Sequence, residues 1–332
     1  MRDTRIDLLR LLLIGAVVCL HTFCVSDTSQ YPFIDALSSM LNVVFHNAVP
    51  MFVMISGIAL MKSHSDMPLM DFYKRRMFRL LVPLVPISLF YVGVRLLRDH
   101  EPWRVVFFES IQGAPYYHLW FAFMLLAVYA LMPLLIRCVK EIPSYLVVPV
   151  ASFFVCLGLL QGEGPWHVVP FAGYAVIGMV IYRAFGNTGD GKIKWLPVLL
   201  LGTGFLAVES VVVCLYMAKG CGWIIGYCSP LILVGSAICL TLWLKGTAGS
   251  VRPFSGSRYV YGVYLIHPIC KGLASAVISR LFPDVASLLL LFPVTLLISF
   301  AVVAMLSRNT VAAVLLGAES LSALLRNKMN VK

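Results

Sequence analysis

Long apolar stretches separated by short polar segments run along nearly the whole chain of 332 residues. A helix needs about 20 apolar residues to cross the hydrocarbon core of a bilayer. The stretches have about that length, and the pattern predicts ten membrane-spanning helices. They fall at residues 8–25, 38–61, 78–97, 116–138, 144–160, 165–184, 196–217, 223–244, 259–279 and 285–306. We therefore expect an all-α, polytopic helical membrane protein.

Composition supports this fold class. The chain is 60% hydrophobic and 12% charged, with a mean hydropathy of +0.91, whereas a soluble domain carries about twice that charged fraction. The net charge of +11 would favour nucleic acid as the partner of a soluble protein. In a membrane protein it reflects the basic residues of cytoplasmic loops, so we expect no nucleic-acid partner. The nine cysteines form no CxxC or Cys/His cluster, and no metal site is predicted.

The distribution of basic residues predicts the orientation in the membrane. If the N-terminus lies inside and the loops alternate, 20 of the 26 basic residues fall on the inner side. Basic residues concentrate on the cytoplasmic side of membrane proteins, so both termini are predicted to be cytoplasmic, in the inner membrane. The outer side receives the other six: Arg95, Arg98, Arg104, Lys219, Lys271 and Arg280.

The end of the chain follows a different pattern. Residues 309–332 carry apolar side chains at helical spacing, followed by Arg326 and Lys328. Such a segment is typical of an amphipathic helix that lies in the inner interface of the membrane. We therefore divide the chain into a transmembrane domain at 1–308 and an interfacial tail at 309–332.

The first apolar stretch carries two ionisable residues, Arg10 and His21. At 100° per residue, their separation of eleven positions returns a helix to within about 20° of the same face, roughly 16 Å farther along. Ionisable groups at membrane depth are costly, and they usually face a bundle interior or a cavity where they have a function. The pair predicts one tunnel with an anion anchor near the inner surface and a proton-transfer group deeper in the membrane.

A second basic motif lies at the inner end of the third stretch. Arg76 and Arg79 are one helical turn apart, and two such guanidinium groups can each bind phosphate oxygens in bidentate fashion. A basic loop that only sets topology or contacts anionic lipid is the alternative interpretation. Asp7 precedes Arg10 by one turn and can hold its guanidinium in place.

The spacing of these residues fits a donor molecule with a phosphate end and a reactive end. About 16 Å separates the level of Arg10 from that of His21, which is close to the reach of an extended pantetheine arm. Acyl-CoA held by Arg10, Arg76 and Arg79 would place its thioester near His21. The imidazole could then deprotonate an acceptor hydroxyl as a general base.

Further ionisable and aromatic residues are candidates for the same site. Glu209 and His267 lie within apolar stretches, and buried ionisable groups are functional candidates by default; the alternative is structural hydrogen bonding. Near the outer ends of two stretches lie polar and aromatic residues that could line the acceptor entrance, although aromatic residues there also serve as interfacial anchors. They are His46, Asn47, Tyr117, His118 and Trp120.

Several motifs resemble those of one known family. Arg5-Ile-Asp-Leu-Leu-Arg10, with His21 after ten further residues, resembles the opening signature of the acyltransferase-3 family of membrane O-acyltransferases. The resemblance continues through Val49-Pro-Met-Phe-Val-Met-Ile-Ser-Gly57, Arg76-x-x-Arg79 with Pro83, His118-Leu-Trp-Phe121 and Tyr264-Leu-Ile-His-Pro268. It implies ten spans and transfer of an acyl group, usually acetyl from acetyl-CoA, to a hydroxyl of a sugar. It also implies catalysis by His21 and donor handling by Arg10, Arg76 and Arg79.

We therefore expect an O-acetyltransferase of the cytoplasmic membrane that modifies a cell-envelope polysaccharide. The expected partners are acetyl-CoA, a glycan or lipid-linked sugar as acceptor, and membrane lipid. The alternative is a transporter or flippase that uses His21, Glu209 and His267 as a proton relay. A transporter does not need the Arg76 and Arg79 pair and more often has repeated halves. A purely structural membrane partner has no use for charges at depth.

Overall fold

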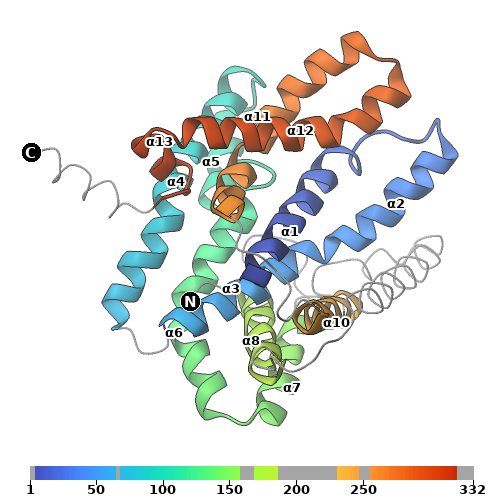
Figure 1. Ribbon diagram of the computed structural model, residues 1–332. Helices are drawn as coiled ribbons and strands as arrows, with labels where there is room; N and C mark the ends of the chain where they lie inside the picture. Colours follow the sequence, from blue (N-terminus) through green and yellow to red (C-terminus); the bar gives the residue numbers. More distant parts are fainter. Residues whose placement is uncertain (1–3, 65–67, 158–167, 186–229, 247–254, 320–332) are drawn as a thin grey trace, which may run out of the picture.

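The computed structural model describes residues 4–64, 68–157, 168–185, 230–246 and 255–319 (Figure 1). Regular structure in these ranges is helical and includes no strand, which confirms the predicted all-α class. The helices are α1 (Thr4–Thr22), α2 (Pro32–His46), α3 (Ala48–His64), α4 (Leu69–Leu97), α5 (Trp103–Ile111), α6 (Trp120–Glu141), α7 (Ser144–Leu157), α8 (Val168–Phe185), α10 (Pro230–Gly246), the 3₁₀ turn η3 (Ser255–Tyr259), α11 (Val260–Leu281), α12 (Asp284–Leu306) and α13 (Thr310–Leu315).

Five helical stretches of the described chain are long and apolar enough to cross a membrane: Pro32–Lys62, Leu69–Leu97, Trp120–Glu141, Gly256–Leu281 and Asp284–Leu306. Large apolar side chains on the outer surfaces of α4 and α12 are exposed, among them Leu89 and Leu297. Extended apolar surfaces of this kind are covered by lipid in a membrane protein. The helices therefore confirm the predicted membrane character.

The predicted spans and the observed helices agree in position but not in every detail. The second predicted span is divided at Asn47 into α2 and α3, and the short helix α5 falls in a segment for which no helix was predicted. The predicted span at 196–217, with Glu209, lies outside the described residues. The number of ten spans and the cytoplasmic termini stay predictions.

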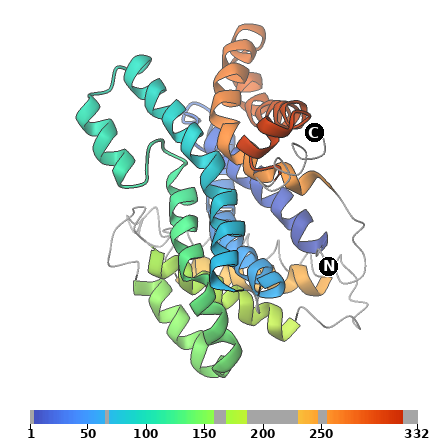
Figure 2. The same cartoon turned by 90° about the vertical axis from the view of Figure 1, so that its left-hand side faces the viewer.

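Two helices, α1 and α8, are each packed against four others. Figures 1 and 2 show the α11–α12 hairpin at one end of the molecule and the α7–α8 pair at the other, with α1 and α3 between them. α1 packs against α2, α3, α11 and α12, whereas α8 packs against α3, α6, α7 and α10. Ile14 and Val18 of α1 are fully buried. α1 can therefore carry charged residues, because its neighbours, rather than lipid, cover much of its surface.

α3 and α8 approach each other closely because each presents a glycine to the other. A Cβ atom added at Gly57 would lie 2.6 Å from the carbonyl oxygen of Ala175, and one added at Gly178 would lie 2.5 Å from that of Met54. Small residues at such crossings are typical of packed membrane helices. Gly57 and Gly178 therefore allow the close packing of α3 against α8.

We expect Gly178→Ala to destabilise the protein by about 1–3 kcal/mol, because the added methyl group meets rigid backbone rather than a flexible side chain. Thermal unfolding in detergent measures the effect. Gly93→Ala is the matched control, since a Cβ atom at Gly93 meets nothing within 4 Å. Equal unfolding temperatures for the two variants would contradict the close approach of α3 and α8.

The start of the predicted tail contributes to the helical body. α13 packs against α4 and α12, and Ala313 and Val314 are buried while Val311 is exposed. Gly317, which follows, has a φ of +69°, and a Cβ there would lie 2.5 Å from the ring of Tyr261. Residues 320–332 lie outside the described part, and the domain division at 308 stays a prediction.

Candidate active site

A cavity of about 570 Å³ lies between α1, α3, α4, α6 and the start of α11. Its volume is within the range of about 300–1,000 Å³ found for small-molecule sites. Both Arg10 and His21 line it. Because both belong to the continuous helix α1, the rise of 1.5 Å per residue places their levels about 16 Å apart.

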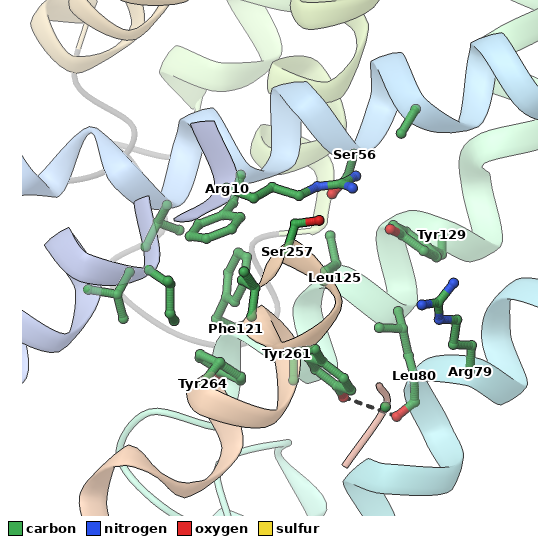
Figure 3. Close-up of a pocket in the computed structure, with 18 of the residues that line it drawn as sticks. Arg10, Ser56, Arg79, Leu80, Phe121, Leu125, Tyr129, Ser257, Tyr261 and Tyr264 are labelled. Carbon is green, nitrogen blue, oxygen red and sulfur yellow. Dashed lines mark hydrogen bonds between the residues drawn. The ribbon is translucent and has the colours of Figure 1, made fainter. Parts of the chain in front are cut away.

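One part of the cavity wall is strongly basic. Arg10, Arg76 and Arg79 line it together, and Arg76 lies within electrostatic range of the other two guanidinium groups. Figure 3 shows Arg10 extending across the cavity toward Ser56, with Arg79 beyond it on the side of Tyr129. Converging guanidinium groups repel one another unless an anion lies among them. The arrangement therefore suits a phosphate-bearing ligand.

Asp7 also lines this part of the cavity and is acidic. Its carboxylate lies 3.4 Å from the Arg10 guanidinium, in the i,i+3 arrangement predicted from the sequence. The side chain of Asp7 is 3% exposed and that of Arg10 is 29% exposed. Asp7 therefore fixes Arg10 from one side and leaves the rest of the guanidinium available to the cavity.

Apolar and aromatic side chains line the wall between the levels of Arg10 and His21. Ile14 and Val17 belong to α1, and Phe121 and Leu125 belong to α6. Tyr261 of α11 also lines the cavity and donates a hydrogen bond to the carbonyl of Leu80 on α4 at 3.0 Å (Figure 3). This bond joins α11 to α4 beside Arg79. The wall can therefore pass a slender, largely apolar chain from the basic region toward His21.

Three histidines from three parts of the chain lie close together at the level of His21, away from the arginines. The ring of His267 on α11 is stacked 5.3 Å from that of His21 and lies edge-on 5.0 Å from that of His118. His21 and His118 line the cavity, and His118 and His267 are buried. The fold therefore brings together two candidates that are more than 240 residues apart in the sequence.

Backbone hydrogen bonding fixes the tautomer of neutral His267. Its Nδ1 lies 2.7 Å from the carbonyl oxygen of Tyr264, so Nδ1 carries the proton and donates it there. Nε2 is then an acceptor, and it has no hydrogen-bond partner among the described residues. A fixed tautomer next to the ring of His21 is suited to accepting a proton.

The carbonyl of His21 is bound by a lysine. Lys271 Nζ, one turn after His267 on α11, donates a hydrogen bond of 2.7 Å to His21 O. The last carbonyls of a helix have no partner within the helix, and α1 ends at Thr22. Lys271 therefore caps α1 and holds His21 at a constant distance from α11.

A polar cluster holds the segment that carries Tyr117 and His118. Arg95, buried at the end of α4, donates to Glu101 and Glu109 at 2.5 Å each and to the carbonyl of Pro115 at 3.3 Å. Two residues farther on, the ring of Tyr117 lies edge-on 5.1 Å from that of His21. The cluster therefore positions an aromatic ring directly beside His21.

We expect Arg95→Gln to destabilise the protein by about 1–2 kcal/mol. This is less than the loss of a fully buried ion pair would cost, because both glutamates are partly exposed to solvent. Hydrogen–deuterium exchange should rise in residues 112–119, whereas Arg104→Gln on exposed α5 should leave it unchanged. Arg95 holds the pKa of Glu101 below its usual range. The stabilisation is therefore complete above the ordinary glutamate pKa and is lost as pH falls through the lowered value. Unchanged exchange in Arg95→Gln would contradict this role.

The remaining predicted residues lie in different places. Trp120 lines the cavity, whereas His46 and Asn47 do not. Asn47 is buried and accepts a hydrogen bond of 2.7 Å from Ser236, which ties α10 to the junction of α2 and α3. His46 Nδ1 lies 2.7 Å from the carbonyl of Asn42 within α2. Glu209 lies outside the described residues, and its role stays a prediction.

Several residues of the cavity wall were not predicted from the sequence. Lys62 and Arg258 add to its basic part, and Ser56, Ser257 and Tyr129 add hydroxyl groups. The only available signal for Lys62 and Arg258 was their assignment to the same side of the membrane as Arg76. Among the described residues, no group of three or more His, Cys, Asp or Glu side chains is placed to hold a metal ion.

Comparison with known proteins identifies the family. The family model described as an acyltransferase domain, acyltransferase-3, matches residues 3–304, which include every residue named above as lining the cavity. No curated protein and no solved structure matches the chain. The match covers well over half of the chain and agrees with its apolar helices. The chain therefore belongs to the acyltransferase-3 family and is a membrane acyltransferase.

Proposed function

We propose that this protein transfers an acetyl group from cytoplasmic acetyl-CoA to a hydroxyl of a glycan or lipid-linked sugar in the cytoplasmic membrane. The observation that carries the proposal is the single cavity shared by Arg10, Arg76, Arg79 and His21. A donor with phosphates at one end and a thioester at the other fits a cavity with cations at one level and an imidazole at another.

The basic residues bind the donor. The diphosphate of acetyl-CoA lies among Arg10, Arg76 and Arg79, where charge-assisted hydrogen bonds are strongest. The pantetheine arm follows the wall formed by residues such as Ile14 and Phe121. The separation of about 16 Å along α1 brings the thioester to the level of His21. Binding at a distance from the reacting atoms thus orients the donor for attack.

His21 acts as the general base. Its imidazole removes the proton of the acceptor hydroxyl while the hydroxyl oxygen attacks the thioester carbonyl. The tetrahedral intermediate collapses with cleavage of the C–S bond, and the departing thiolate takes the proton from the imidazolium of His21. The products are the O-acetyl ester and coenzyme A. His267, stacked on His21, holds the plane of the His21 ring.

The acceptor approaches His21 from the side opposite the arginines. Tyr117 is exposed and lies edge-on to His21, and Trp120 lines the cavity. Aromatic rings with a polar tip suit the faces and hydroxyl groups of sugars. We therefore assign acceptor binding to Tyr117 and Trp120, with His118 beside them.

Transport is the competing function. The stacked rings of His21 and His267 resemble part of a proton relay, and buried histidines serve this purpose in transporters. A relay, however, gives no role to three converging arginines at the other level of the same cavity. Acyl transfer gives a role to both groups.

A label-transfer experiment tests the proposal. Membranes that contain the protein are incubated with acetyl-CoA labelled in the acetyl group, and the glycan and lipid-linked sugar fractions are extracted. The proposal predicts label in one of these fractions, released by mild alkali as expected for an ester. Absence of transfer to a full set of acceptors, with the protein present at normal levels, would favour transport instead.

A further inference from the structure

The short helix α5 carries large apolar side chains that the rest of the described protein leaves uncovered. Trp103, Phe107 and Ile111, at positions i, i+4 and i+8, form a stripe along one face of this helix. Their exposed fractions lie between 54% and 65%, whereas Val106 is buried. Contiguous exposed apolar side chains mark a surface that contacts another protein or a membrane. The stripe therefore indicates a partner.

Contacts with the end of α4 hold α5 in place. α5 packs against α4, and Arg95 of α4 donates to Glu109 of α5 at 2.5 Å. Phe107 and Glu109 are two residues apart, so they lie on nearly opposite sides of the helix. Figure 2 shows α5, in blue-green, at the edge of the molecule. The ion pair therefore faces α4, and the stripe is held as a fixed surface on the other side.

The length of α4 places α5 near a membrane surface. α4 has 29 residues and is about 43 Å long, which is close to the thickness of a bilayer with its headgroup regions, about 40–45 Å. The end of α4 at Leu97 therefore reaches the headgroup region. α5, with nine residues, is about 14 Å long and too short to cross the membrane. Its length and position suit a helix that lies in the interface.

The stripe continues the lipid-facing surface of the protein. Leu89 and Leu97 on α4, from which α5 is suspended, are exposed apolar residues of that surface. At the start of α5, the Arg104 guanidinium carbon lies 5.6 Å from the centre of the Trp103 ring. Tryptophan is enriched at the headgroup level of membranes, and an arginine there extends its apolar stem along the hydrocarbon while its charge stays in water. The pair thus has the character of an interfacial anchor.

The charges around the stripe add no net attraction of their own. The segment 95–111 contains three arginines and three carboxylates: Arg95, Arg98, Arg104, Asp99, Glu101 and Glu109. Their formal charges cancel, whereas a surface that binds anionic headgroups has an excess of lysine and arginine. Contact with the stripe is therefore driven by burial of apolar area, and it should not depend on the charge of the lipid.

We propose that α5 is a membrane-surface anchor, in which the stripe of Trp103, Phe107 and Ile111 inserts into the leaflet that surrounds the end of α4. The partner is the hydrocarbon of the lipid. This position also fixes the height of the following segment, which carries Tyr117, relative to the membrane surface. The anchor is independent of the donor and the acceptor of the reaction.

Fluorescence quenching of Trp103 tests the anchor. The full-length protein is reconstituted into phosphatidylcholine vesicles whose acyl chains carry bromine, and the Trp103 signal is taken as the difference between the wild type and Trp103→Phe. We expect brominated lipid to remove most of this signal, and iodide on both sides of the membrane to remove little of it. Replacement of part of the phosphatidylcholine by phosphatidylglycerol should leave the quenching by brominated lipid unchanged.

A double variant tests the rest of the stripe. Phe107→Asn/Ile111→Asn keeps Trp103 and removes the two other members, so the Trp103 signal should become less sensitive to brominated lipid and more sensitive to iodide. The difference is taken against the same double variant with Trp103→Phe added. Phe153→Asn is the matched control, because Phe153 lies on α7 and is exposed to a similar degree. It should leave the Trp103 signal as in the wild type.

Three results would overturn the anchor. Quenching of the wild-type Trp103 signal by iodide and not by brominated lipid would show that the stripe faces water. Quenching by neither would show that protein covers the stripe, and chemical cross-linking of two copies would then identify a second chain as the cover. Quenching by brominated lipid only when phosphatidylglycerol is present would show that lipid charge, rather than apolar burial, brings α5 to the membrane.

Discussion

Replacement of His21 by alanine is expected to lower the rate of acyl transfer by about 10²- to 10⁴-fold, the usual contribution of a general base. The loss should fall on kcat, because His21 lies away from the arginines that we propose to bind the donor. The affinity for acetyl-CoA should therefore stay within about twofold of the wild type. The measurement is the initial rate of label transfer from acetyl-CoA, with donor affinity determined on the same preparation.

A second histidine provides the control for this variant. His100 is exposed, lies outside the cavity and has a φ of +54°. Asparagine tolerates that conformation, so His100→Asn removes an imidazole without straining the loop, and its transfer rate should equal that of the wild type. A His21→Ala enzyme that transfers at the wild-type rate would exclude His21 as the base.

The double variant Arg76→Gln/Arg79→Gln should show the second large effect, a loss of donor affinity of about 10²-fold or more. Each glutamine keeps much of the side-chain volume and removes one positive charge, and hydrogen bonds to charged groups are worth about 1.5–3 kcal/mol each. Direct binding of acetyl-CoA to the purified protein measures the loss. In contrast to His21→Ala, this variant should recover part of its rate when the donor concentration is raised.

The matched control for the arginine pair is Arg308→Gln. Arg308 is exposed beyond the end of α12 and does not line the cavity, so this variant should bind acetyl-CoA as the wild type does. If Arg76→Gln/Arg79→Gln bound the donor with unchanged affinity, the two arginines would serve only to orient the chain in the membrane.

Much of the helical architecture could be predicted from the sequence, because apolar stretches of membrane-spanning length are a strong signal. The positions of α4, α6, α11 and α12 follow directly from it. The relation between Arg10 and His21 could also be predicted, since it depends only on one uninterrupted helix, and α1 is such a helix. The Asp7–Arg10 ion pair has the same local origin.

Contacts between helices could not be predicted in this way. Hydrophobic spacing identifies which residues avoid water, but it does not identify which helices become neighbours. The stacking of His267 on His21 and the hydrogen bond from Lys271 to the His21 carbonyl depend on the packing of α11 against α1. For the same reason, Lys62 and Arg258 could be assigned to a side of the membrane but not to the cavity.

Asn47 illustrates the limit for residues of the acceptor side. Its place near the end of an apolar stretch made it a candidate for sugar binding, yet its side chain is buried and hydrogen-bonded to Ser236 on α10. An asparagine in an apolar stretch can donate and accept hydrogen bonds either with a neighbouring helix or with a ligand. The sequence pattern is the same in both cases. The Ser236 partner is 189 residues away, so the sequence pattern could not show it, and the acceptor role of Asn47 stays a prediction.

We propose that one cavity receives the donor at the level of its arginines and the acceptor at the level of His21. Sealed membrane vesicles of the two orientations test it most directly, with labelled acetyl-CoA added only to the outside of each. We expect label in the glycan with inside-out vesicles, in which the cytoplasmic surface faces the donor, and almost none with right-side-out vesicles until they are opened. Equal labelling in intact vesicles of both orientations would contradict it.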